Sequence, residues 1–159
     1  MHMVTYRRAN KQYVAMTDDE VWAFIDSRKV MFIAFNGVDG YPHLTPVWHV
    51  AIDRKLYFRA TSSKVKVRLS DSAKVCCAFE DGELFTELRG VALWGRASVV
   101  GDAGMIERYS ALQRTKYAGL TSRDLAMPDA WLRERSAEES SIVEVDPERI
   151  SSWDNRKIQ

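Results

Sequence analysis

The sequence predicts a mainly β protein, a six-stranded antiparallel β-barrel with flanking α-helices. Runs rich in β-branched and aromatic residues alternate with Gly-, Asp- and Asn-containing turns, which is typical of strands joined by hairpins. Three such runs follow one another within residues 30–59, and connections this short join antiparallel strands. We expect the sheet to close into a barrel, because closure removes exposed strand edges.

Length and composition indicate one domain. A chain of 159 residues, with 46% hydrophobic and 28% charged residues, can form a single core, and it contains no repeat or low-complexity linker. We therefore expect one domain over residues 1–159, with residues 1–14 as a loose N-terminal arm. Cys76 and Cys77 are adjacent and cannot cross-link distant segments. With no apolar run near the roughly 18 residues of a membrane span, the expected localisation is cytoplasmic.

The expected elements follow from local patterns. A helix from about Thr17 to Ser27 is predicted because Thr17 can cap its first turn while Glu20 reaches back to the cap. Strands are expected over residues 30–35, 43–52, 55–59, 73–79, 84–100 and 141–145, with turns at 36–40, 53–54 and 81–82. The fifth strand is expected to bend at Gly90 or Gly95, where glycine tolerates a bulge. Further helices are expected over residues 103–117 and 128–136.

A basic segment is the main departure from an otherwise balanced chain, whose net charge is only +1. Between Arg54 and Lys74 a single acidic residue, Asp71, accompanies seven basic ones: Arg54, Lys55, Arg59, Lys64, Lys66, Arg68 and Lys74. Inside this segment a hydroxyl cluster (Thr61, Ser62 and Ser63) lies between Arg59 and Lys64. Hydroxyl donors beside fixed cations at a helix start suit a phosphate group. The same composition also fits a solvated helix start with an ordinary cap.

The second strand carries two prolines, Pro42 and Pro46, followed by Val47 and Trp48. Proline lacks a ladder donor, so these positions belong at an edge, a bulge or the rim of a pocket. Backbone freed from the ladder beside an aromatic side chain could contact a flat heteroaromatic ring. The alternative is that Trp48 packs in the core.

Other kinds of site receive little support. His43 and His49 are six residues apart on one strand and therefore share a face, but no third ligand has suitable spacing for zinc. Cys76 and Cys77 alternate across a strand, so one is expected in the core and the other partly exposed. No Gly-rich loop follows a strand, which disfavours a Rossmann site or a P-loop. We expect no metal site.

Four stretches, in this order, resemble the FMN-binding split-barrel family related to pyridoxamine 5′-phosphate oxidase. They span roughly residues 15 to 157 in the family's order, and they are Asp39–Trp48, Leu56–Lys64, Glu87–Ala97 and Asp146–Asp154. The last two look most like the actinobacterial branch of flavin- and deazaflavin-dependent oxidoreductases. Some members of that branch use FMN and others use coenzyme F420.

The resemblance implies a homodimer with two cofactors at the subunit interface and hydride transfer between FMN, or alternatively F420, and a small organic substrate. It implies that Pro46, Val47 and Trp48 contact the cofactor ring. It also implies phosphate contacts from Arg59, Thr61, Ser62, Ser63, Lys64 and Lys66. Because the cofactor ring carries such chemistry, no catalytic side chain is predicted.

The chain departs from the family in several places. The family's phosphate-binding lysine lies four residues before an aliphatic anchor, whereas Lys64 lies five and Lys66 three before Leu69, which leaves the register open. Gly90 replaces the flavin-contacting glutamine of the oxidase. The oxidase's C-terminal Arg-Leu-Ala-Pro ending is absent, which disfavours pyridoxamine phosphate as substrate. The C-terminal histidine of haem-degrading relatives is absent too, which disfavours haem.

Two other functions compete with the oxidoreductase. A non-catalytic module that binds a flavin, deazaflavin or bilin would need the same residues. A single-stranded nucleic-acid-binding barrel could use Trp48, Tyr57 and Phe58 with the neighbouring lysines. The near-neutral charge and the acidic residues after Val75 disfavour nucleic acid, so we expect neither nucleic acid nor membrane as a partner.

Overall fold

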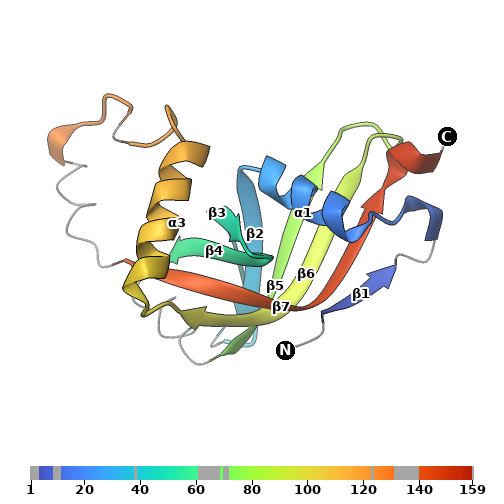
Figure 1. Ribbon diagram of the computed structural model, residues 1–159, viewed down its shortest axis with the longest axis horizontal. Coiled ribbons are helices and arrows are strands. Elements are labelled where there is room, and N and C mark those ends of the chain that lie inside the picture. The colour runs from blue at the N-terminus through green and yellow to red at the C-terminus, as the bar shows by residue number, and fades with distance from the viewer. Residues whose placement is uncertain are drawn as a thin grey trace.

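The computed structural model describes residues 4–8, 12–37, 39–60, 69, 72–122, 124–130 and 140–158. Six antiparallel strands form a closed barrel in the order β7-β4-β3-β2-β5-β6, which β6 closes by pairing with β7 (Figure 1). The predicted fold class is therefore confirmed. The strands are β1 (Thr5–Arg8), β2 (Val30–Asn36), β3 (Pro42–Ile52), β4 (Lys55–Ala60), β5 (Ala73–Asp81), β6 (Arg89–Val99) and β7 (Ser141–Asp154).

Strand β7 is much longer than predicted. The expected end at Val145 was wrong, because the strand continues through Pro147 to Asp154 and pairs with β6 along its length. A register shift between Trp94 and Gly95 places Pro147 opposite Gly95, and such an irregularity accommodates proline within a sheet. The irregularity lies at Gly95, one of the two glycines where a bulge was expected, although the extra residue, Glu148, belongs to β7. Residues 5–8 of the expected arm form β1, which pairs with β7 in parallel.

Strand β6 begins at Arg89, so the strand start predicted at Leu84 was wrong. The Leu84 carbonyl accepts hydrogen bonds from the Glu87 and Leu88 N–H groups at 2.8 and 3.1 Å, which folds this stretch into a turn. Gly82 precedes the turn with a φ of +97°, a conformation that favours glycine. Apolar residues in the turn imitated a strand pattern, although their side chains are exposed.

Helix α1 (Asp18–Ser27) confirms the predicted capping box. The Glu20 N–H donates to Thr17 Oγ1 at 3.3 Å, and the Thr17 N–H donates to the Glu20 carboxylate at 2.7 Å. The helix buries Val21, Phe24 and Ile25 in the main core, among the inward side chains of the strands. Short 3₁₀ helices η1 (Gln12–Val14) and η2 (Asn155–Ile158) lie near the two ends of the described chain.

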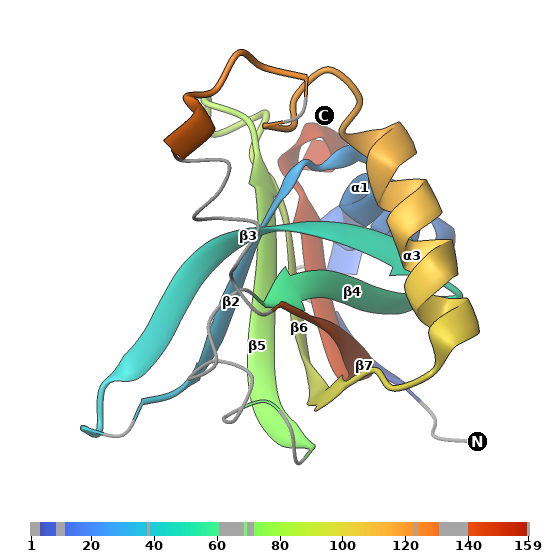
Figure 2. The same ribbon diagram turned by 90° about the vertical axis from the view of Figure 1, so that its left-hand side faces the viewer.

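Helix α3 (Ala103–Lys116), begun by the Asp102 cap, lies outside the barrel against β3 and β4 (Figure 2). It covers a second apolar cluster formed by Val50, Ile52, Tyr57, Tyr109 and Ile142. The helix predicted over residues 128–136 falls mostly outside the described residues. Within the described part of the chain, neither α1 nor α3 is long and apolar enough to cross a membrane.

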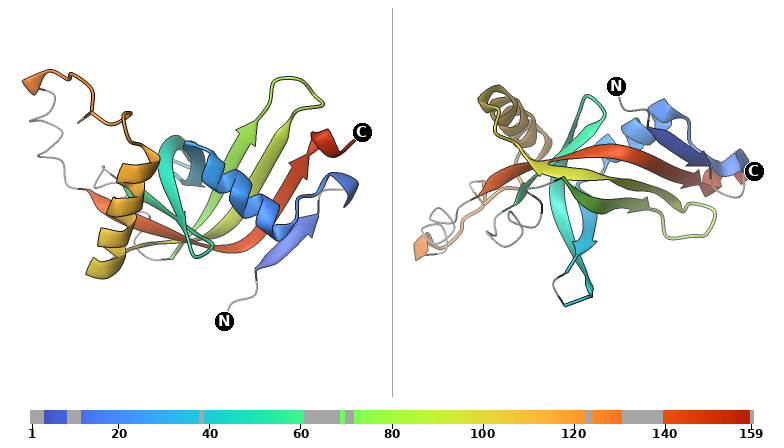
Figure 3. Two further views of the ribbon diagram at one scale, coloured as in Figure 1. Left: turned by 45° about the horizontal axis from the view of Figure 1, so that its top comes forward. Right: turned by 90° about the horizontal axis from the view of Figure 1, so that it is seen from below.

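Strand β3 belongs to two strand pairs in succession. Its first half pairs with β2 from Pro42 to Trp48, and its second half pairs with β4 from His49 to Ile52. The tip of the β2–β3 hairpin consequently projects from the body of the barrel, as Figures 2 and 3 show. The site described below lies where β3 changes partners.

The bulge at Gly95 gives a testable stability effect. A Cβ atom there would lie 2.3 Å from the Asp146 carbonyl oxygen, which is backbone and cannot move aside cheaply. Gly95→Ala is therefore expected to lower the free energy of unfolding by about 1–3 kcal/mol in urea denaturation. Gly101→Ala is the matched control, because a Cβ there meets nothing within 4 Å, and it should change stability by less than about 1 kcal/mol. Equal effects would contradict the packing explanation.

Candidate functional site

The structure brings Trp48, predicted to contact the ring, and Arg59, predicted to contact the phosphate, to one edge of the barrel. His49 and Phe58 are the first paired residues where β3 and β4 separate, and Trp48 and Arg59 are the next residues along the two strands. Side chains alternate along a strand, so both leave the sheet on the outer face, opposite to the buried His49 and Phe58. Trp48 is 36% exposed and Arg59 is exposed.

The indole of Trp48 is held by a buried tyrosine at the C-terminal end of α3. Tyr117 stacks on Trp48 with ring centroids 4.3 Å apart and an interplanar angle of 13°. The Tyr117 hydroxyl accepts the His49 N–H at 2.9 Å and lies 2.7 and 2.8 Å from the carbonyl oxygens of Lys29 and His49. Burial raises the pKa of Tyr117 to about 12, so the hydroxyl stays protonated at neutral pH. Trp48 therefore lies outside the core, and its stacking on Tyr117 fixes the orientation of its indole ring.

Pro46 and Val47 present different groups to this edge. Pro46 is exposed on the same outer face as Trp48, where it lies opposite Phe32 of β2. Val47 is half-buried, packs against the main core and lies opposite the buried Met31. A ligand on the outer face could therefore meet the Pro46 ring and the Trp48 indole, but only the backbone of Val47.

Within the described part of the chain, Arg59 uses only part of its donor capacity. Its Nη1 donates to Ser140 Oγ at 2.7 Å, whereas a guanidinium carries five N–H groups. Strand β4 ends at Ala60, so the predicted phosphate segment follows Arg59 directly in the chain. Its residues Thr61, Ser62, Ser63, Lys64 and Lys66 lie outside the described residues, and their phosphate contacts stay a prediction.

Next to this edge, the sheet presents a surface that we call the outer sheet face. Strand register places small and apolar side chains in adjacent rows, namely Phe32, Ala34, Leu44, Pro46, Cys76, Ala78, Ala92 and Trp94. Leu44 is 64% exposed, and Pro46 and Ala78 are exposed as well. Cys76 is half-buried on this face while Cys77 is buried inside, which confirms the predicted alternation. Arg149 lies over the Trp94 ring at 3.9 Å.

Sequence reasoning missed Tyr117 and Tyr109. Both are fully buried, Tyr117 behind Trp48 and Tyr109 in the cluster that α3 covers. Their spacing of eight residues puts them on one face of the helix, and this signal was available in the sequence. Nothing local, however, indicates that Tyr117 meets Trp48, which lies 69 positions earlier.

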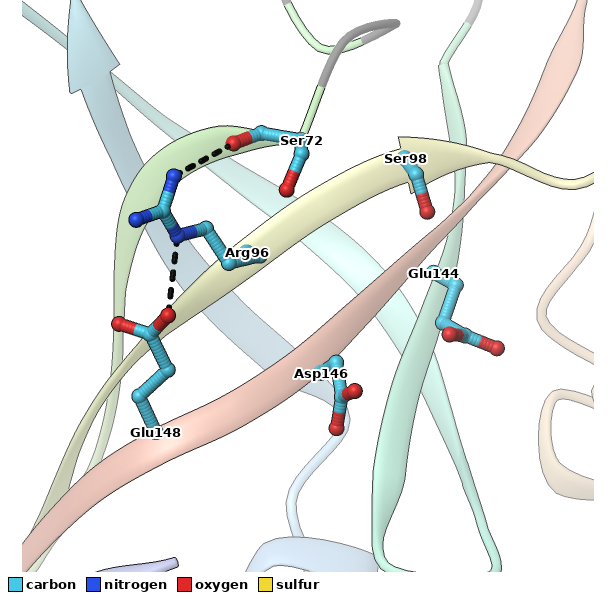
Figure 4. A pocket seen from close by; sticks show the side chains of 6 residues that line it. All are labelled: Ser72, Arg96, Ser98, Glu144, Asp146 and Glu148. Atoms are coloured by element: carbon cyan, nitrogen blue, oxygen red, sulfur yellow. Dashed lines mark hydrogen bonds and ion pairs between the residues drawn. The ribbon is translucent and has the colours of Figure 1, made fainter. Parts of the chain in front are cut away.

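A polar cavity of about 240 Å³ is lined by outward-facing side chains of β6 and β7 (Figure 4). Its lining residues are already paired with one another or with close neighbours. Arg96 Nε lies 2.9 Å from Glu148 Oε1, its Nη1 donates to the Ser72 carbonyl at 3.2 Å, and Lys55 Nζ lies 2.8 Å from Glu144 Oε1. We interpret this cavity as a partly exposed ion-pair network.

The closed barrel and its projecting β2–β3 hairpin define the class of split β-barrels. A family model described as pyridoxamine 5′-phosphate oxidase matches residues 17–152, and the chain belongs to that family. No curated protein matches the chain.

Three solved structures illustrate the fold. A conserved hypothetical protein from Mycobacterium tuberculosis is 26% identical, with a TM-score of 0.76 over 94% of this chain and 92% of that chain. The FAD binding protein from Mycobacterium smegmatis is 19% identical, with a TM-score of 0.62 over 88% and 98%. The haem storage protein from Vibrio cholerae is 13% identical, with a TM-score of 0.61 over 84% and 92%. The last two likenesses concern the fold alone.

Proposed function

We propose that the protein is a flavin- or deazaflavin-dependent oxidoreductase that transfers a hydride between bound FMN, or alternatively F420, and a small organic substrate. Membership of the pyridoxamine 5′-phosphate oxidase family supports a flavin-type cofactor, and the similar fold of the FAD binding protein from Mycobacterium smegmatis agrees with it. The observation that carries the proposal is the placement of Trp48 and Arg59 on adjoining strands and on one face.

The described residues fit a cofactor with a flat ring and a phosphate tail. The exposed part of the Trp48 indole and the Pro46 ring offer apolar contact surface, and Tyr117 fixes the indole before any ligand arrives. A surface that is already ordered loses less side-chain entropy when it binds a ring. Arg59 supplies cationic donors beside it, and the proposed phosphate contacts of Thr61, Ser62, Ser63, Lys64 and Lys66 would extend them.

A second copy of the chain would complete the site. The outer sheet face borders Trp48 and leaves Leu44, Pro46 and Ala78 exposed. Exposed apolar surface of this kind marks a binding surface. We therefore place the cofactor at the interface of a homodimer, so that the partner subunit covers the side of the ring that Trp48 and Pro46 leave open.

The role of the protein in this proposal is to bind, orient and shield. A bound flavin or deazaflavin supplies the hydride chemistry. Arg59 and the basic segment hold the phosphate end, the Trp48–Tyr117 stack fixes the ring edge, and the partner subunit excludes water. Tyr117 would not act as a general acid or base, because its pKa of about 12 keeps its proton in place near neutral pH.

The test begins with the visible absorption spectrum of the purified protein, followed by titration with FMN and, separately, with F420. Saturable binding of one cofactor at one equivalent per chain supports the proposal, and sedimentation of the loaded protein as a dimer supports the interface placement. Failure to bind either cofactor at micromolar concentration contradicts the cofactor assignment. If a monomer binds the cofactor, the placement at a dimer interface is contradicted but the cofactor assignment is not.

A non-catalytic binding module is the second candidate. One observation favours it: Trp48, Tyr117 and Arg59 supply contacts to a ring and an anion, which is all that a module would need. The haem storage protein from Vibrio cholerae, whose name refers to storage rather than to a reaction, has a similar fold. The two candidates differ in turnover. A loaded protein whose cofactor is neither reduced by a nicotinamide donor nor oxidised by any acceptor is a module.

A further inference from the structure

A cavity of about 500 Å³ lies between α1, α3 and the β3–β4 hairpin, away from the outer sheet face. Its walls are mostly apolar, with contributions from Trp22 of α1, Val50 and Ala51 of β3 and Leu112 of α3. Lys116, the last residue of α3, lines the same cavity. The proposed cofactor site does not use this space.

The amine of Lys116 is poorly neutralised where it lies. Its side chain is only 12% exposed, and Nζ is 3.3 Å from His49 Nε2 and 3.8 Å from Asp26 Oδ1. His49 is fully buried and offers an imidazole rather than a charge, while Asp26 is 69% exposed and at the limit of an ion pair. The Lys116 ammonium is therefore desolvated with little compensation.

Among the residues that the structure describes, the other charged groups around the cavity do not neutralise Lys116. Lys29 brings a second cation, and its Nζ donates to the Lys116 carbonyl. On the β3–β4 turn, Asp53 is paired with Arg108 at 2.6 Å and Arg54 with Asp19 at 3.0 Å. Burial first, and then the Lys29 charge, lower the pKa of Lys116 to about 8, while Asp26 opposes the shift.

A lysine in this setting is a nucleophile. A side-chain amine becomes reactive when it is desolvated in an apolar pocket or lies beside another cation, and Lys116 meets both conditions. At pH 7.5 a group with a pKa of about 8 is roughly one quarter neutral, whereas an ordinary lysine is only about 0.1% neutral. His49 is held beside Lys116 by its Nε2 contact with the Ile25 carbonyl at 3.0 Å, and burial lowers the His49 pKa to about 3, so the imidazole does not take up the Lys116 proton.

We propose that this cavity is a ligand site separate from the cofactor site, in which the Lys116 amine captures an uncharged aldehyde with an apolar body. The neutral Nζ attacks the carbonyl carbon, and a C–N bond forms as a proton moves from nitrogen to oxygen. The carbinolamine then loses its hydroxyl group and the remaining nitrogen proton as water, which leaves an imine. No oxidant or reductant is needed.

The apolar walls select the ligand class. Trp22, Val50 and Leu112 favour a hydrocarbon or aromatic body. Asp26 and Asp53 border the cavity, but so do Arg54 and Lys116, so the selection rests on the apolar walls rather than on charge. Benzaldehyde should therefore react better than glyoxylate, although both carry an aldehyde.

The test is reductive trapping of the full-length protein with benzaldehyde and cyanoborohydride at pH 7.5, with the modified lysines located by peptide mass mapping. Lys116 is expected to be benzylated at least tenfold faster than Lys74, an exposed lysine of β5. Its labelling rate should level off just above pH 8. Glyoxylate should label Lys116 more slowly than benzaldehyde.

Different variants test the role of the cavity and the role of the Lys116 amine. Leu112→Trp fills the cavity from the partly exposed face of α3 and should slow labelling of Lys116 at least fivefold, while Lys74 is unaffected. Lys116→Arg should remove the fast-labelled site, and Lys74→Arg should leave it intact. Equal labelling of all lysines, faster reaction with glyoxylate, or Lys116 labelling that Leu112→Trp does not slow would overturn the proposal. None of these readouts depends on a flavin.

Discussion

Replacing both Lys64 and Lys66 with alanine will weaken FMN or F420 binding by at least about 100-fold, because each charge-assisted hydrogen bond to phosphate contributes about 1.5–3 kcal/mol. Arg59→Ala alone is expected to cost about 10- to 100-fold for the same reason. Fluorescence titration measures the dissociation constants. The melting temperature of the cofactor-free protein should be unchanged, because these side chains are proposed to serve the ligand rather than the core.

The matched control is Lys74→Ala, which removes an exposed lysine from β5 and should leave affinity unchanged. The single variants also decide the register that the sequence leaves open, since the lysine closer to the phosphate will account for the larger share of the loss. If the double variant binds as tightly as the wild type, the phosphate assignment of residues 61–66 is wrong, and the cation at Arg59 needs another explanation.

Acid will destabilise the protein through His49. Burial, reinforced by the Lys116 ammonium, lowers the pKa of His49 from 6.5 to about 3. Between these two values the unfolded chain takes up a proton at this imidazole and the folded protein does not. Stability is therefore complete above pH 6.5 and falls as the pH is lowered, by about 1.4 kcal/mol per pH unit and by up to about 4–5 kcal/mol in total.

The comparison that isolates this effect is His49→Gln, whose amide can still donate to the Ile25 carbonyl, 3.0 Å from His49 Nε2. Urea denaturation at pH 6.5 and 4.5 gives the free energy of unfolding of both proteins. Wild type should lose about 2 kcal/mol more than the variant over this interval, since the carboxylate contributions are common to both. Parallel losses would show that His49 is protonated in the folded state.

The sequence was sufficient to predict the elements that depend on interactions between residues close together in the chain. Thr17 and Glu20 specify the start of α1 by themselves, and the β-branched and aromatic runs of β2, β3 and β4 lie between strong turn signals. Local rules were insufficient where pairing decides the outcome. Pro147 is tolerated inside β7 because of the register shift on β6, and residues 5–8 form a strand because β7 offers them an edge.

The candidate site likewise combines features that the sequence indicates with features that only the folded sheet determines. Pro46, Trp48 and Arg59 could each be singled out from residue type and order. Their common face depends on where β3 leaves β2 for β4, which is a property of the sheet. The stack of Tyr117 on Trp48 and the approach of Lys116 to His49 join segments nearly 70 residues apart, and no sequence spacing encodes such contacts.

The position of β7 in the chain has a consequence for biosynthesis. This strand pairs with β1, β4 and β6, yet it follows all three as the ribosome extends the chain. Until Ser141–Asp154 has emerged, β4 and β6 each keep an unpaired edge, and such edges can pair with other nascent chains. We therefore expect barrel closure to be a late step of folding, slowed by its long-range contacts, and chaperones to matter most while β7 is still being made.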